Sequence, residues 1–182
     1  YGWIFPKGDH LNVGIGTVYP GVRNLRALLD AYLAREGLVA GTTAQIQGHP
    51  LPFEGLEGGR VTSVRTLLLG DAAGLVDPFT GEGIHNACLS ACLAAEAIIA
   101  RRRRPGGAVE VYQNLVRENI LKELKRAYWW GRVFYRYADY AMRFLEKRPV
   151  LARELWGILF RGNYRDIWGC VGRYFLRTFK AV

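Results

Sequence analysis

Residues 67–87 read LLLGDAAGLVDPFTGEGIHNA, and this stretch decides how the chain around it folds. Residues 66–69 are a short apolar run, which predicts a buried strand. Residues 84–100 are rich in Ala and Leu, which predicts a well-buried helix. Gly and Pro punctuate the connection between them, so we expect a sharp strand–loop–helix unit.

The predicted loop carries the pattern of a ligand site. The strand delivers Gly70 and Asp71 to a sheet edge, where ligands of open sheets bind, and an Asp there accepts hydrogen bonds from ribose or ribityl hydroxyls. Gly81 and Gly83 let the backbone approach a ligand, and the helix that begins beside them directs free N–H groups and a positive dipole end at it. The pattern indicates a nucleotide-like ligand with hydroxyls and negative charge. The alternative is a tight structural connection in which Asp71 caps the helix.

Before this unit, the sequence predicts strands and one helix. A β-hairpin is expected from residues 1–6 and 10–17, with its turn at 7–9. Residues 24–36 have the apolar spacing of an amphipathic helix, and Gly37 is its expected stop. Residues 44–53 are expected to form another strand, followed by a Gly-rich loop over 54–60.

After the unit, the sequence predicts helices only. Residues 108–147 follow one long helical pattern with an expected kink near Gly131. Pro149 is expected to open another helix through Phe160, and residues 164–182 are again periodic. The predicted fold class is therefore α+β, with a mixed half followed by a helical half.

Charge and aromatic residues are unevenly distributed over the 182 residues. Residues 1–100 hold 6 Lys and Arg against 9 Asp and Glu, a net charge of −3, whereas residues 101–182 hold 19 against 7, a net charge of +12. Of the 23 aromatic residues, 15 lie between Tyr128 and Phe179. A basic, aromatic half suits an anionic surface, either nucleic acid or lipid headgroups. Arg101–Arg104 are interpreted as a solvated helix end or as a headgroup contact.

Composition excludes several classes of protein. A hydrophobic content of 50% excludes a disordered chain. Polar residues interrupt the most apolar window, residues 84–100, so a membrane-spanning helix is not expected. The three cysteines, Cys88, Cys92 and Cys170, have no disulfide spacing, which favours a reducing cytoplasmic compartment. His85, Cys88 and Cys92 share a helix face, but packing of a buried helix explains them better than a metal site.

Two motifs resemble one family of flavoproteins. GDAAGLVDPFTGEGI resembles the second FAD-binding motif of proteins with a glutathione-reductase-type FAD domain, and is most similar to the geranylgeranyl reductase family. YGWIFPKGDHLNVGIG is similar to that family's Tyr-x-Trp-x-Phe-Pro hairpin with its trailing Asn-Val-Gly-x-Gly. Two motifs in the right order are more specific than either alone. The Gly-x-Gly-x-x-Gly fingerprint is absent, so the resemblance implies that an N-terminal half, with the other half of the FAD site, is missing from this chain.

The resemblance implies a function, a cofactor and a set of site residues. The function is an FAD-dependent reductase that saturates C=C bonds of a prenyl chain in a lipid, chlorophyll or quinone, with NAD(P)H or ferredoxin as electron donor. It implies that FAD is bound by Asp71, Gly74, Pro78, Thr80, Gly81, Gly83 and Ile84. It implies that the prenyl substrate lies against Tyr1, Trp3, Phe5 and Pro6. The corresponding domains are 1–60 for substrate, 61–104 for FAD and 105–182 for the helical region, in a cytoplasmic protein that contacts a membrane surface.

The sequence leaves alternatives for the function and for the catalytic residues. A flavin-dependent monooxygenase or halogenase is the alternative enzyme, and a non-enzymatic lipid- or nucleic-acid-binding fragment is the second alternative. The sequence does not identify the catalytic acid. Glu82 and Asp77 are candidates, but a carboxylate at a helix N-terminus is as easily a partner of the helix dipole. Nucleic acid is not expected as a partner, because basic charge without a recognition motif is weak support.

Overall fold

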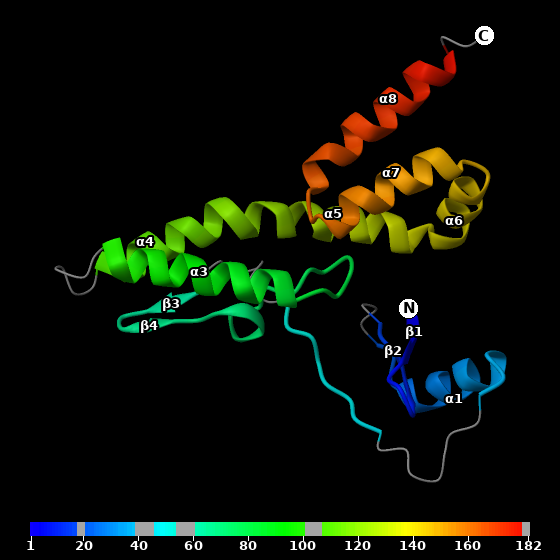
Figure 1. Ribbon diagram of the computed structural model, residues 1–182, viewed down its shortest axis with the longest axis horizontal. Coiled ribbons are helices and arrows are strands. Elements are labelled where there is room, and N and C mark those ends of the chain that lie inside the picture. The colour runs from blue at the N-terminus through cyan, green and yellow to red at the C-terminus, as the bar shows by residue number, and fades with distance from the viewer. Residues whose placement is uncertain (18–20, 39–45, 54–60, 101–106, 180–182) are drawn as a thin grey trace. The chain divides into compact units, whose positions relative to one another are not determined.

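The computed structural model describes residues 1–17, 21–38, 46–53, 61–100 and 107–179. The chain divides into two units, Tyr1–His49 and Pro50–Val182. It contains two small antiparallel sheets and is otherwise mainly helical (Figure 1), so the predicted α+β class is confirmed.

The first unit is the predicted hairpin followed by the predicted helix. Strand β1 (Gly2–Pro6) pairs with β2 (Leu11–Ile15) in an antiparallel register that sets Trp3 opposite Gly14. Helix α1 (Leu25–Arg35) begins where the Asn24 side chain accepts a hydrogen bond from the Ala27 N–H at 3.0 Å. Gly37 follows the helix with φ 68°, a left-handed conformation that Gly adopts without strain.

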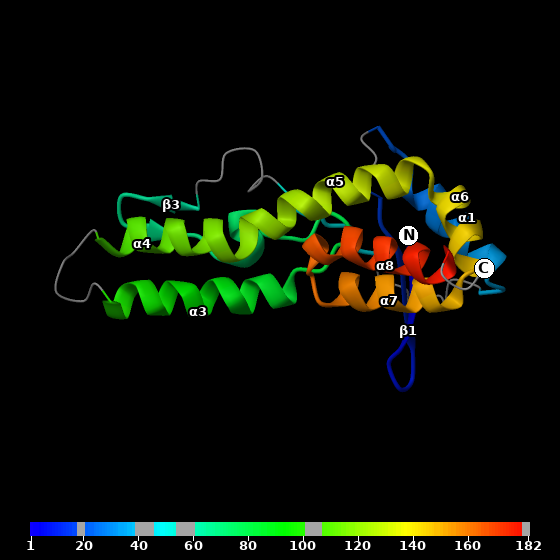
Figure 2. The same ribbon diagram turned by 90° about the horizontal axis from the view of Figure 1, so that it is seen from above.

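The second unit begins with a short hairpin and two packed helices. Strands β3 (Thr62–Ser63) and β4 (Thr66–Leu67) pair antiparallel, and the 3₁₀ turn η1 (Gly70–Ala73) follows. Helix α3 (Ile84–Ala100) and helix α4 (Gly107–Val116) then run side by side (Figures 1 and 2). The first core lies between these elements and comprises Val61, Ala73, Leu75, Leu93, Ala94, Ala97, Tyr112, Val116, Ile120, Leu121 and Leu124.

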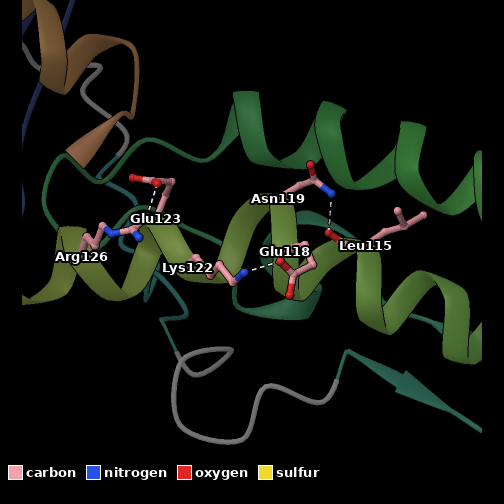
Figure 3. A network of polar contacts seen from close by, with 6 residues as sticks. All are labelled: Leu115, Glu118, Asn119, Lys122, Glu123 and Arg126. Carbon is pink, nitrogen blue, oxygen red and sulfur yellow. Dashed lines mark hydrogen bonds and ion pairs between the residues drawn. The ribbon is translucent and has the colours of Figure 1, made fainter. Parts of the chain in front are cut away.

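A π-helical turn joins α4 to the next helix. The turn, η2 (Arg117–Leu121), runs directly into α5 (Lys122–Arg136), so the three segments form one continuous helical rod. Polar side chains interact along the rod (Figure 3): Lys122 pairs with Glu118, Arg126 pairs with Glu123, and Asn119 Nδ2 donates to the Leu115 carbonyl at 2.8 Å.

The remaining helices form a second core. They are α6 (Ala138–Glu146), α7 (Pro149–Phe160), the turn η3 (Tyr164–Asp166) and α8 (Ile167–Phe179). Pro149 opens α7, as predicted, because a Pro at the first helical position forfeits no hydrogen bond. The second core comprises Phe79, Ala127, Leu151, Ile158, Tyr164, Ile167 and Cys170.

Two of the predictions of secondary structure are wrong. Described residues 46–53 form no strand; Pro50 and Pro52 lack the N–H groups that a ladder needs. The long helix does not kink at Gly131, which is buried against Phe79 in the middle of α5. It ends at Tyr137, whose backbone leaves the helical region with φ −126° and ψ 32°.

Two further expectations hold only in part. Of the predicted strand 66–69, only Thr66–Leu67 pairs, and Leu68 and Leu69 are exposed. Helix α3 has its predicted bounds but buries one face, leaving Ile98 and Ile99 exposed. The predicted loop 54–60 and Arg101–Arg104 lie outside the described residues. Within the described part of the chain, no helix is both long enough and apolar enough to cross a membrane.

Candidate functional site

Gly70 docks the end of the second hairpin onto α3. Its φ is 51°, and its N–H donates to Ser90 Oγ at 3.0 Å. A Cβ at this position would lie 2.8 Å from the Ala87 Cβ, so glycine is required both by the backbone conformation and by the close approach. Ser90 in turn donates to the Ala87 carbonyl at 2.9 Å. The 3₁₀ turn that carries Asp71 is thereby held against α3.

Gly74 closes that turn in a left-handed conformation, with φ 65°. Its N–H donates to the Asp71 carbonyl at 2.9 Å, and the Leu75 N–H donates to the Gly70 carbonyl at 3.2 Å. Asn86 of α3 then donates to the Leu75 carbonyl at 2.9 Å. Gly74 is buried, so its role is to shape the backbone that presents Asp71.

Asp77 organises the next turn with both carboxylate oxygens. Oδ1 accepts hydrogen bonds from the N–H groups of Phe79 at 2.8 Å and Thr80 at 3.0 Å. Oδ2 accepts from the Tyr164 hydroxyl at 2.7 Å. The side chain is only 6% exposed. Asp77 was a candidate acid on sequence grounds; its position is that of an Asx-turn residue whose oxygens are engaged.

Glu82 caps the start of α3. Its Oε1 accepts a hydrogen bond from the His85 N–H at 2.8 Å, while its own N–H donates to Thr80 Oγ1 at 3.3 Å. A carboxylate on the first turn of a helix also interacts favourably with the helix dipole. This geometry is that of a helix cap and agrees with the interpretation of Glu82 as a partner of the helix dipole.

Asp71 and Gly83 meet at the mouth of the loop. A Cβ on Gly83 would lie 2.9 Å from Asp71 Oδ1, so the exposed carboxylate occupies the space that the missing side chain leaves. Gly81, with φ 74°, turns the chain just before this point. The N–H groups of Gly83 and Ile84 donate to no other residue that the structure describes. An acceptor carboxylate thus lies beside two free donors at the positive end of a 17-residue helix.

The predicted cofactor residues therefore divide into two groups. Asp71, Thr80 and Ile84 are exposed, and Gly81 and Gly83 are half-buried around them; Ile84 is 79% exposed. Gly74 and Pro78 are buried behind this surface. The first group, Asp71, Thr80, Gly81, Gly83 and Ile84, forms the accessible part of the loop, which we call the rim. The second group lies beneath it.

The predicted substrate residues form an aromatic row along β1. The Tyr1 and Trp3 ring centroids are 5.9 Å apart, and those of Trp3 and Phe5 are 6.4 Å apart. The rings lie across β2, because a Cβ on Gly14 would be 2.1 Å from the Trp3 ring and one on Gly16 would be 2.7 Å from the Tyr1 ring. The alternation of Gly in the trailing motif thus makes room for the rings on one face of the hairpin.

Polar contacts fix this row. Trp3 Nε1 donates to Asn12 Oδ1 at 2.8 Å, and Pro6 ends β1 opposite Leu11. Tyr1 and Phe5 are each more than half exposed. The row is an exposed aromatic surface whose central ring, that of Trp3, is held by its hydrogen bond. The hairpin belongs to the first unit and the loop to the second.

Sequence reasoning missed the residues that hold the loop from a distance. Tyr164 and Tyr135 come from the helical region, 87 and 56 residues from the atoms that they bind. Tyr135 donates to the Phe79 carbonyl at 2.6 Å. Ser90 was also missed, although a lone hydroxyl inside an Ala-rich helix is a usable signal. Among the described residues, no three potential ligands gather into a metal site. His85, Cys88 and Cys92 are exposed, so the prediction that they pack a buried helix face is wrong.

Comparison of the sequence with known proteins finds relatives of one kind. The chain is homologous to part of the geranylgeranyl reductases, which confirms the resemblance seen in its two motifs. The geranylgeranyl diphosphate reductase of rice chloroplasts is 38% identical over 131 residues, which is 71% of this chain and 27% of that protein.

Two other relatives extend the match. The geranylgeranyl diphosphate reductase of Synechocystis is 40% identical over 103 residues, covering 55% of this chain and 25% of that protein. The digeranylgeranylglycerophospholipid reductase of Methanothrix thermoacetophila is 30% identical over 187 residues, covering 92% of this chain and 46% of that protein. The chain thus spans less than half the length of these relatives. No family model matches the chain. No solved structure matches it.

Proposed function

We propose that the chain is part of an FAD-dependent reductase that saturates C=C double bonds of a prenyl chain. The observation that carries the proposal is the match, over 54–92% of the chain, to proteins named geranylgeranyl diphosphate reductase or digeranylgeranylglycerophospholipid reductase. The prenyl group would belong to a lipid, a chlorophyll or a quinone, and the electrons would come from NAD(P)H or ferredoxin.

The rim around Asp71 has the donor and acceptor set that FAD needs. The Asp71 carboxylate would accept hydrogen bonds from ribityl hydroxyls, or lie beside the adjacent pyrophosphate. The free N–H groups of Gly83 and Ile84 would face the N1/C2 edge of the ring, and the positive end of α3 favours the negative charge that collects there on reduction. Because Gly83 has no side chain, the Asp71 carboxylate lies close to the backbone of the helix start, and a ligand at this point would meet the carboxylate and the N–H groups together. The reduced flavin, when bound, supplies the hydride.

The hairpin would serve the substrate. A prenyl chain is long and apolar, and Tyr1, Trp3 and Phe5 form a row of aromatic rings. Asn12 holds the Trp3 ring by a hydrogen bond, and Gly14 and Gly16 leave room for the rings of Trp3 and Tyr1. Pro6 would complete this surface at the end of the strand. Their role would be to hold the alkene and to exclude water from it.

The basic helical region would carry the protein to a membrane surface from the cytoplasmic side. Residues 101–182 have a net charge of +12. Large aromatic side chains stand exposed on the described helices, among them Tyr140, Phe160 and Trp168. Aromatic and cationic side chains together suit the interface of an anionic bilayer, where each basic residue contributes about 1 kcal/mol.

A visible spectrum of the protein, expressed with its natural neighbouring sequence, tests the proposal. We expect oxidised-flavin bands, and we expect Asp71→Ala to lose them while the protein stays folded. Anaerobic reoxidation of the reduced protein by a prenyl lipid would establish a reductase. Oxygen consumption with NAD(P)H and no prenyl saturation would establish a monooxygenase instead. A folded, colourless wild-type protein would refute the flavin assignment.

A further inference from the structure

The loop that would bind flavin is tied to the helical region by a buried side-chain pair. Tyr164, on the turn between α7 and α8, is only 1% exposed, and its hydroxyl donates to Asp77 Oδ2 at 2.7 Å. Burial and the neighbouring Asp77 carboxylate both raise the pKa of the Tyr164 hydroxyl, so it stays a proton donor throughout the physiological range. A hydrogen bond to a charged acceptor in a buried place is among the stronger ones.

That bond fixes the orientation of a carboxylate that itself shapes the loop. With Oδ2 held by Tyr164, Oδ1 of Asp77 faces the N–H groups of Phe79 and Thr80. The Gly81 N–H donates to the Asp77 carbonyl at 2.9 Å, and the Asp77 N–H donates to the Glu82 carbonyl at 2.8 Å. Asp77 therefore makes hydrogen bonds to the backbone of Phe79, Thr80, Gly81 and Glu82, and Gly83 and Ile84 follow directly.

A second tyrosine holds the same loop from α5. The Tyr135 hydroxyl donates to the Phe79 carbonyl at 2.6 Å. The Phe79 ring meets the rings of Phe134 and Tyr135 edge to face, at centroid distances of 5.3 Å and 5.7 Å. Both peptide groups of Phe79 are thus engaged, the N–H by Asp77 and the carbonyl by Tyr135.

We infer that Tyr164 and Tyr135 are positioning residues of the flavin site, which they set by holding the Asp77–Glu82 turn so that the N–H groups of Gly83 and Ile84 face the ligand. This inference rests on the proposed function for the identity of the ligand. Neither tyrosine is placed against the flavin itself; each acts through Asp77 or Phe79. The helical region is then part of the cofactor site and not only an attachment to the membrane.

Hydrogen exchange and flavin binding, measured on the protein with its natural neighbouring sequence, test the inference. The variants are Tyr164→Phe and Tyr135→Phe, each of which removes one hydroxyl. The matched control is Tyr128→Phe, because Tyr128 lies on the same helix as Tyr135 and its hydroxyl accepts a hydrogen bond from Arg132 at 3.1 Å on an exposed part of the helix. Exchange is followed in a peptide over residues 76–84, and FAD affinity is followed by titration of the apoprotein.

We expect Tyr164→Phe to raise exchange in that peptide about tenfold and to raise the Kd for FAD about tenfold, which corresponds to about 1.4 kcal/mol. The flavin midpoint potential should become more negative, because less well placed N–H groups stabilise the reduced anion less. Tyr135→Phe should act in the same direction, and it stands as the test if Tyr164→Phe does not fold. Tyr128→Phe should leave affinity, potential and exchange over 76–84 unchanged.

Two results would separate failure of the inference from failure of the proposed function. Wild-type affinity and potential in Tyr164→Phe and Tyr135→Phe, as in Tyr128→Phe, would overturn the inference and leave the flavin site intact. A wild-type protein that binds no flavin would overturn the proposed function and the assignment of a positioning role with it. In that case, faster exchange over 76–84 in Tyr164→Phe would still report a purely structural tie.

Discussion

Replacing Gly83 by Ala tests whether the Asp71 carboxylate, in the position that it has beside Gly83, contributes to FAD binding. The new Cβ would lie 2.9 Å from Asp71 Oδ1 and 3.5 Å from Val76 Cγ2. Only the first distance is too short, and the atom concerned is the end of an exposed side chain. Gly83 is not among the residues with positive φ, so the substitution adds no backbone strain. We expect the Asp71 carboxylate to swing away while the loop keeps its fold.

The magnitudes of the two effects should differ. Exchanging Gly for Ala beside a helix N-terminus changes stability by about 1 kcal/mol or less. A hydrogen bond between the Asp71 carboxylate and a ligand hydroxyl contributes about 1.5–3 kcal/mol, so losing it should weaken FAD binding about 10- to 150-fold. A large loss of affinity at nearly constant stability is the signature of a ligand contact.

Fluorescence titration of the apoprotein with FAD measures the first quantity, and urea unfolding measures the second. Gly172→Ala is the matched control, since a Cβ there meets nothing within 4 Å, and it should change neither quantity beyond helix propensity. An affinity for Gly83→Ala within about twofold of wild type would refute the role given to Asp71, because the displaced carboxylate would then contribute nothing to binding.

Three other predictions concern stability and the hairpin. Gly70→Ala should destabilise the second unit by about 1–3 kcal/mol or more in urea unfolding, because a left-handed backbone and a contact with Ala87 both oppose it. The raised pKa of Tyr164 means that the native state keeps a proton which the unfolded chain loses above about pH 10, so unfolding free energy should fall as the pH rises beyond that value, and less so in Tyr164→Phe. Gly14→Val should displace the Trp3 ring, which lies where the new side chain would be, and should shift tryptophan emission to longer wavelength; unchanged emission would contradict the ring placement.

Local signals in the sequence predicted most helix ends correctly. Asn24, Gly37 and Pro149 each act within one turn of their own position, through a cap, a left-handed residue and a preset φ. Such effects need no knowledge of distant residues. They could therefore be inferred from sequence alone, and the structure confirms the helices Leu25–Arg35 and Pro149–Phe160 that they delimit.

Signals that depend on packing were misjudged. Gly131 was expected to kink a helix because Gly is a poor helix former, but its lack of a side chain lets Phe79 pack closely on α5. The break falls at Tyr137, a residue with no breaking tendency of its own. At Gly131 a tertiary contact overrides intrinsic propensity, and that contact comes from a loop more than fifty residues away in the sequence.

The residues of the candidate site also differ in whether local sequence signals could predict them. The residues on the rim, Asp71 and Gly81 to Ile84, follow from the strand–loop–helix pattern and from the resemblance. The residues behind it, Tyr135 and Tyr164, carry no local signal, because nothing in their neighbouring sequence points to Asp77 or Phe79. The aromatic enrichment of the helical region was interpreted as a surface property, and part of it instead builds the second core.

The loop joins the two cores of the second unit, and this explains how it holds its shape without regular structure. Leu75 is fully buried in the first core, and Phe79 lies in the second, so the short segment between them is anchored at both ends. Asp77, halfway between, is anchored by Tyr164. Only after Phe79 does the chain emerge, at Thr80, into the exposed rim. A ligand bound there meets backbone that two cores hold in place, so little conformational entropy remains to be lost on binding.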